Sequence, residues 1–358
     1  MPLYPSFHRT IRHANQTDIS LKWRCPGRRA TVVYRRGRAL YLNATRLSEY
    51  YGAGLAAHAL KNISDGLLAR RRGGLMNVLV LGIDSTSRMN FNRHMKRTRR
   101  LLLGKLNAFE LFGYNKVGDS SFSNQIPLLM GKSADEVKRI VRNDNLDDLL
   151  LLWNHYSVRG YATLFLEEMP FYSLFTYPNY RGFRKPPTDY YPVPVLHAME
   201  ENGGIDVYCA GSRLKTQVFL EYLKDVMDLN ADHGIPMFSY VWLSDVLHSN
   251  EHGLLALDDP VHELLRDMQK RRALEDTALV LLSDYGARFG SNRATVIDRL
   301  EDNAPIGYVV LPRRFLRGHP KAAVNLERFF LVGVNTDSCF WPFTRAAWRS
   351  LIAREQDQ

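Results

Sequence analysis

From residue 76 onward, short apolar runs alternate with longer stretches in which apolar residues recur at helical spacing. Short runs rich in Val, Leu and Ile are typical of strands that are buried on both faces. The alternation predicts a three-layer α/β/α domain around a largely parallel sheet. The expected strands are residues 76–83, 161–166, 236–242, 278–283 and 306–311.

Helical spacing predicts three helices between these strands, over residues 134–155, 212–229 and 258–274. One more helix is expected within 46–69. The proline-rich stretch 186–194 is expected to form a loop, because proline cannot donate a backbone hydrogen bond to a sheet or to a helix interior.

The positive charge of the chain is concentrated at its N-terminal end. The formal net charge is +11, yet residues 1–100 hold 20 Lys and Arg against 4 Asp and Glu, so the remainder is net acidic. We interpret residues 1–74 as a basic, irregular segment, followed by a domain over 75–350 and a tail over 351–358. A solvated basic face is one interpretation, and binding to an acidic surface such as a glycan or lipid head group is another. No nucleic-acid motif or aromatic interleaving accompanies the charge, so no nucleic-acid partner is expected.

Three N-x-Ser/Thr sequons, at Asn15, Asn43 and Asn62, indicate a glycoprotein in the extracellular space or the secretory lumen. Three cysteines allow one disulfide and one free thiol. No apolar run reaches the 18 residues of a membrane span, so no membrane anchor is expected in this chain. Because it also lacks an apolar leader, we expect the natural N-terminus to be missing.

Two of the expected strands end in a carboxylate, at Asp84 and Asp284, and Ser121 follows a Gly-Asp-Ser turn. The carboxyl ends of parallel strands meet at one edge of a sheet, where α/β proteins bind ligands. Two hard oxygen ligands and a hydroxyl are what a metal-assisted nucleophile requires. Each residue also has an ordinary alternative, since Asp84 could cap a helix and Ser121 could bond its own backbone.

Three segments together resemble one family: Gly82–Arg88, Gly113–Asn124 and Ser283–Gly290. The chain resembles, over about residues 75–345, the DUF229 family of the alkaline-phosphatase and sulfatase superfamily. The resemblance implies an alkaline-phosphatase-like fold and descent from metal-dependent hydrolases of phosphate or sulfate esters.

The resemblance also implies roles for individual residues. Asp84 and Asp284 would bind one divalent cation, expected to be zinc, and Ser121 would be the nucleophile. Asn124 would stabilise the oxyanion. A second cation would have His248 as a ligand, with Asp245 as a substitute for an acid that the family has and this chain lacks.

The chain departs from the family at positions that matter for the metal. Tyr285 stands where the family has a ligand histidine, and a phenol with an ordinary pKa near ~10 is a poor metal donor at neutral pH. Cys339 stands where a second family histidine is expected, and Ser123 replaces a proline.

These losses lead to three hypotheses. The first is a weakened or inactive ester hydrolase, in which the cation is present at reduced occupancy or absent. The second is an active hydrolase that uses Ser121, with Asp245, His252 or Cys339 compensating for the lost ligands. The third is a non-catalytic binder of acidic glycans or lipid head groups.

Overall fold

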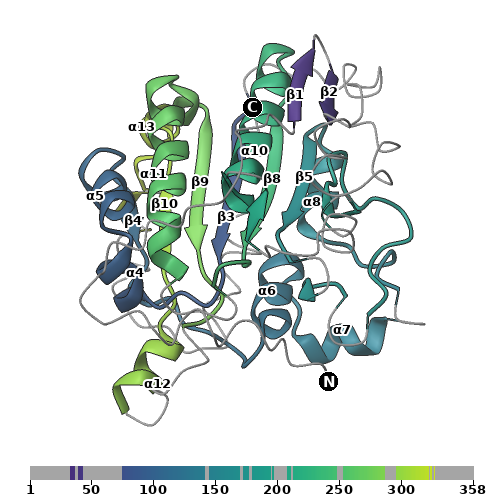
Figure 1. Ribbon diagram of the computed structural model, residues 1–358, viewed down its shortest axis with the longest axis vertical. Coiled ribbons are helices and arrows are strands. Elements are labelled where there is room, and N and C mark those ends of the chain that lie inside the picture. The colour runs from purple at the N-terminus through teal and green to yellow at the C-terminus, as the bar shows by residue number, and fades with distance from the viewer. Residues whose placement is uncertain are drawn as a thin grey trace.

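A six-stranded sheet forms the centre of the molecule in the computed structural model (Figure 1). Its order is β4 (Phe109–Glu110), β10 (Gly307–Val310), β9 (Thr277–Leu282), β3 (Asn77–Ile83), β8 (Met237–Leu243) and β5 (Ala162–Glu167). The structure describes residues 75–141, 145–169, 172–176, 180–194, 196, 208–210, 213–247, 253–286, 296–321, 323, 324 and 326, and the strands at 33–36 and 39–42.

The four strands β9, β3, β8 and β5 are parallel, whereas β10 and β4 continue the sheet in antiparallel pairs. All residues of β5, β8 and β9 are buried. Such strands read as continuous apolar runs because helices cover both faces of the sheet. The expected strands and the three-layer α/β/α architecture are therefore confirmed, with an antiparallel edge added to the parallel sheet.

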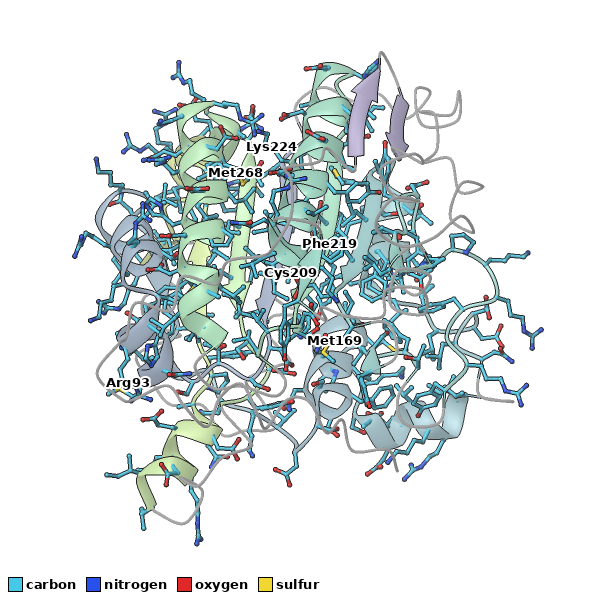
Figure 2. All side chains as sticks on the ribbon, viewed as in Figure 1. Arg93, Met169, Cys209, Phe219, Lys224 and Met268 are labelled. Atoms are coloured by element: carbon cyan, nitrogen blue, oxygen red, sulfur yellow. The ribbon has the colours of Figure 1, made fainter. Side chains whose placement is uncertain are left out.

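Helices cover both faces and divide the apolar core in two. One face packs against α4 (Arg88–His94), α5 (Lys96–Gly104), α10 (Lys215–Asp232) and α11 (Leu254–Lys270). Phe219 of α10 and Met268 of α11 belong to this part of the core and are labelled in Figure 2. The opposite face packs against α6 (Ser121–Met130), α7 (Ala134–Ile140) and α8 (Leu152–Ser157).

The single helix expected over 134–155 is wrong, because two short helices stand there. The first, α7, begins with a capping box between Ser133 and Glu136 and ends where Val141 becomes extended. The backbone then leaves helical geometry, and Leu146 N–H donates to the carbonyl of Gly182 at 3.1 Å. Leu146 stays buried in this non-helical conformation. A tertiary hydrogen bond and core packing have thus overridden a helical spacing.

The remaining elements lie around this core. Helix α12 (Val296–Asn303) follows the β9 loop, α13 (Arg313–Gly318) follows β10, and the 3-10 helix Ala273–Glu275 precedes β9. The hairpins are β1 (Val33–Arg36) with β2 (Ala39–Leu42), and β6 (Cys209–Ala210) with β7 (Arg213–Leu214).

Strand β1 lies beside α10 (Figure 1), so part of the expected irregular segment 1–74 forms a hairpin next to the domain. The helix expected within 46–69 lies outside the described residues. Among the described helices, none combines the length and the apolar character needed to cross a membrane.

Candidate functional site

The ends of the neighbouring strands β3 and β9 bring Asp84 and Asp284 together. Both aspartates are buried, with exposed fractions of 2% and 1%. The backbone N–H of Ser85 donates to Asp284 Oδ1 at 3.3 Å, and the N–H of Thr86 donates to Ser283 Oγ at 2.9 Å. Ser85 has a φ of +51°, a left-handed conformation that is uncommon for a residue with a side chain. The two strand ends are therefore bound to each other at a tight turn.

Ser121 is the first residue of α6, directly after the N-cap residue Ser120. Its Oγ lies 3.5 Å from Asp84 Oδ1 and 3.3 Å from the phenolic oxygen of Tyr285. The N-terminus of a helix has unpaired N–H groups and a partial positive charge, which favours an anion there. Ser121 thus stands where a developing alkoxide would be stabilised, next to a carboxylate that could accept its proton.

Tyr285 occupies the centre of this group and is 1% exposed. Burial, and then the charges of Asp84 and Asp284, raise the pKa of the phenol far above its ordinary value. The phenol therefore stays protonated, and it acts as a neutral hydrogen-bond partner of Ser121. Its own backbone N–H donates to Asp284 Oδ1 at 3.0 Å.

Three side chains that the sequence interpretation missed, one from α6 and two from β8, position the aspartates. Tyr240 donates to Gln125 Oε1 at 2.8 Å, and Gln125 Nε2 lies 3.5 Å from Asp284 Oδ2. Trp242 Nε1 lies 3.4 Å from Asp84 Oδ1. The period of two along β8 places Tyr240 and Trp242 on one face, but their partners depend on the pairing of β8 with β3.

Glu167, at the end of β5, adds a third buried carboxyl group to this region. Its pKa is raised to about 8, mainly by burial and also by the charges of Asp84 and Asp284, against the opposing effect of the hydrogen bond from the Leu174 N–H. The pKa of Asp284 also lies well above its ordinary value, because of burial and then the charge of Asp84. A carboxylate at a strand end is the signal that identified Asp84, so the same signal could have found Glu167.

Asn124, from which an oxyanion contact is expected, uses its amide within its own loop. Its Oδ1 accepts the N–H groups of Val117 at 2.7 Å and Gly118 at 3.0 Å. Its Nδ2 donates to the carbonyls of Gly118 and Ser120, both at 2.9 Å. The expected oxyanion role stays a prediction, and in this structure Asn124 positions the loop that carries Ser121.

The other expected ligands lie apart from this group. Asp245 follows β8 and forms an ion pair with Lys215, whose Nζ is 3.0 Å from Asp245 Oδ2. His248, His252 and Cys339 lie outside the described residues. The second cation site that the resemblance implies is therefore represented here by Asp245 alone, and a lysine already neutralises that carboxylate.

Within the part of the chain that the structure describes, no three His, Cys, Asp or Glu side chains gather closely enough to bind one metal ion. Catalytic zinc centres use three such ligands and an open position. Asp84, Asp284 and Ser121 supply oxygen atoms only, and the fourth neighbour is a protonated phenol. The described residues do not fit the donor set of a zinc centre.

Comparison with known proteins identifies the family of this chain. The sequence matches the family model described as "Protein of unknown function (DUF229)" over residues 68–329. No match is found among curated proteins. The layered sheet described above is a three-layer α/β/α fold around a mostly parallel sheet.

Three solved structures are among those that resemble this chain at low sequence identity. The C-terminal periplasmic domain of EcEptC from Escherichia coli, in complex with Zn, is 14% identical, with coverage of 78% of this chain and 83% of that chain and a TM-score of 0.48. The lipoteichoic acid synthase LtaP from Listeria monocytogenes is 11% identical, with 75% and 72% coverage and a TM-score of 0.45. The PsFucS1 sulfatase from Pseudoalteromonas sp. is 13% identical, with 69% and 65% coverage and a TM-score of 0.42.

Proposed function

From the premise that this chain belongs to the DUF229 family, we propose that it is a phosphate- or sulfate-ester hydrolase-like protein whose catalytic activity is weak or lost. One observation carries the proposal. The phenol of Tyr285 lies 3.3 Å from Ser121 Oγ, at the position where the resemblance implies a ligand histidine. A neutral hydrogen-bonding group thus stands beside the expected nucleophile.

The electrostatics of the site support weak activity. Phosphate and sulfate esters are anions, and hydrolysis adds charge that positive groups or hydrogen-bond donors must stabilise. The neighbours of Ser121 described above are two aspartates and a phenol. The charges of both aspartates also raise the pKa of the nearby Glu167. The raised pKa values of Asp284 and Glu167 mean that protons lower the charge of the cluster. These groups provide no positive charge for an anionic ester.

An active hydrolase is the second candidate, and one feature favours it. Ser121 combines a helix N-terminus with a carboxylate 3.5 Å away, which is the arrangement that an activated hydroxyl requires. In this alternative, ligands outside the described residues would complete a cation site. Measured metal content and turnover distinguish the two candidates.

The first test replaces Tyr285 with histidine, and Tyr285→Phe is the matched control without an imidazole. Protein from a secretory host, purified without chelators, is assayed for bound zinc by elemental mass spectrometry and for turnover of an aryl phosphate and an aryl sulfate. We expect wild type and Tyr285→Phe to carry little zinc, and Tyr285→His to gain zinc and turnover.

The Ser121→Ala variant tests the second candidate, an active hydrolase. If wild-type protein already binds zinc stoichiometrically, and if its turnover disappears in Ser121→Ala with the fold unchanged, the chain is an active hydrolase and our first proposal is wrong. Equal residual turnover in wild type and Ser121→Ala would exclude Ser121 as the nucleophile.

We also propose that the protein works in the secretory lumen or outside the cell. Cys209, labelled in Figure 2, is disulfide-bonded. Structural disulfides persist in oxidising compartments and are rare in the cytosol. The three sequons point the same way.

We further propose that residues 1–74 bind an acidic glycan or lipid surface. Removal of these residues should then abolish retention of the protein on an anionic column.

A further inference from the structure

A second buried charged group lies at the same edge of the sheet, on the face covered by α10. Lys215 is the first residue of α10 and is 6% exposed. Its Nζ is 3.0 Å from Oδ2 of Asp245, which is 3% exposed. Ser121, in contrast, begins α6 on the opposite face of the sheet. The Lys215–Asp245 pair is therefore separate from the group around Tyr285.

Glu168 adds a second carboxyl group beside this pair. It is 1% exposed, and its Oε2 accepts the backbone N–H groups of Ser244 at 2.9 Å and Asp245 at 3.0 Å. Burial and then the charge of Asp245 raise the pKa of Glu168 to about 7, whereas Thr216 works in the opposite direction. Two buried acidic groups thus lie side by side, and Lys215 forms an ion pair with one of them, Asp245.

Thr216 forms a hydrogen bond with the Glu168 carboxyl group, whereas one buried hydroxyl next to the pair makes no hydrogen bond within the described structure. It is Oγ of Ser244, the residue before Asp245, which is 6% exposed. Buried polar atoms nearly always have a partner, so this hydroxyl beside the carboxyl groups of Asp245 and Glu168 points to something that it could bind. Carboxylate and hydroxyl oxygens are ligands of hard divalent cations.

We propose that Lys215 is a built-in cation that takes the place of a divalent metal ion beside Asp245 and Glu168, and that these carboxyl groups bind a hard divalent cation once the ammonium group is removed. A lysine ammonium is a compact point charge with three donors, so it can replace a cation beside a buried carboxylate. The site is accordingly closed to metal in the wild-type chain. This inference concerns residues outside the Ser121 group and does not rest on the proposed function.

Manganese binding to Lys215→Met tests the inference. Methionine keeps most of the aliphatic length of lysine and removes its charge, which leaves Asp245 and Glu168 without their cation. We expect Lys215→Met to bind one Mn²⁺ per chain more than wild type, measured by the loss of the free-ion electron paramagnetic resonance signal during titration. Thermal unfolding gives a second readout, since a ligand that binds only the folded state raises the Tm of the variant and not that of wild type.

Two controls separate cation binding from general destabilisation. Lys215→Met/Asp245→Asn removes both charges of the pair, so it should fold without metal and bind no additional Mn²⁺. Lys215→Arg keeps a positive charge and should behave as wild type in the titration. Rescue of a poorly folded Lys215→Met protein by Mn²⁺ during expression or refolding would also support the inference.

Two results would overturn the inference. One is a folded Lys215→Met protein that binds no more Mn²⁺ than wild type. The other is a Lys215→Met protein that stays unfolded with Mn²⁺ present while the double variant folds. Neither result bears on Tyr285, because zinc content and turnover of Tyr285→His are measured with Lys215 unchanged.

Discussion

Gly82 is the residue at which the sheet makes room for Trp242. A Cβ atom added at Gly82 would lie 1.8 Å from Cε3 of Trp242, whose indole stacks on Tyr240 in the same strand with ring centroids 5.8 Å apart. Trp242 is also the residue whose Nε1 approaches Asp84. One missing side chain in β3 therefore fixes both the packing of the ring and the position of a site carboxylate.

Gly82→Ala should destabilise the protein because Trp242 cannot keep its position. Overpacking of a core commonly costs about 1–3 kcal/mol, and we expect a loss of that size in the free energy of unfolding from urea titration. Gly104→Ala is the matched control, since nothing lies within 4 Å of the added Cβ at the end of α5. It should leave stability unchanged or raise it by about 0.4–1 kcal/mol. Equal effects of the two changes would contradict this account of Trp242.

Asn124 makes a second prediction at the residue scale. Asn124→Asp keeps the acceptor atoms for Val117 and Gly118 and removes both donors to the loop carbonyls. Buried groups that lose their partners cost about 1–3 kcal/mol each, so thermal unfolding should show a clear fall in Tm. Asn303→Asp is the control, because Asn303 is exposed and donates one hydrogen bond within its own helix. A Tm equal to that of wild type would show that the loop does not depend on Asn124.

At the scale of elements, α12 is bound to the site through its C-terminal half. Glu301 accepts two hydrogen bonds from Arg93 of α4, at 2.8 and 2.7 Å, and one from Ser87 at 2.9 Å. Asp302 pairs with Lys116 at 2.5 Å, and its carbonyl accepts the N–H of Gly286, directly after Tyr285. Helix α12 therefore connects the loop before Ser121 with the loop that carries Tyr285.

Glu301→Gln should destabilise the protein at neutral pH and not in acid. Hydrogen bonding to Arg93 lowers the pKa of Glu301 in the folded state. A lowered folded-state pKa means that the stabilisation is complete above the unfolded glutamate pKa, ~4.3, and is lost as the pH falls through the folded value. Because Arg93 is 48% exposed, we expect a difference of only about 0.2–1 kcal/mol at pH ~7.

Urea unfolding of wild type and Glu301→Gln over a pH series measures this difference. The free energies of unfolding of the two proteins should converge as the pH falls below the ordinary glutamate range. A difference that is constant with pH would show that Glu301 acts through packing and not through its charge.

At the scale of the whole molecule, the carboxyl ends of four parallel strands carry a row of acidic residues. Asp284 follows β9, Asp84 follows β3, Asp245 follows β8, and β5 ends at Glu167, which Glu168 follows directly. The sequence predicts the strands and their terminal carboxylates because a buried strand is a local apolar run. It does not reveal that Lys215 reaches Asp245, since that contact depends on how α10 packs on the sheet.

Local and tertiary causes also determine which helices the sequence predicts. Periodicity predicts α10 and α11 because each has a long, continuous apolar face. It does not predict α6, whose first turn is Ser-Phe-Ser-Asn and which contains Pro127. The start of α6 depends on the cap at Ser120 and on the loop bonds of Asn124, which are invisible to a count of apolar positions.

The covalent state of the whole chain provides the last prediction. The chain has three cysteines, and Cys209 is disulfide-bonded, so its partner is Cys25 or Cys339, both outside the described residues. Alkylation in denaturant without reductant should therefore label one cysteine, and alkylation after reduction should label three, as counted by mass spectrometry. Peptide mapping of the unreduced protein identifies the partner.

Cys209→Ser should expose two thiols and lower the free energy of unfolding by about 2–4 kcal/mol, because the unfolded chain loses a constraint. Labelling of all three cysteines without reductant, in protein made through a secretory host, would exclude the disulfide and remove one of the two supports for a secretory location.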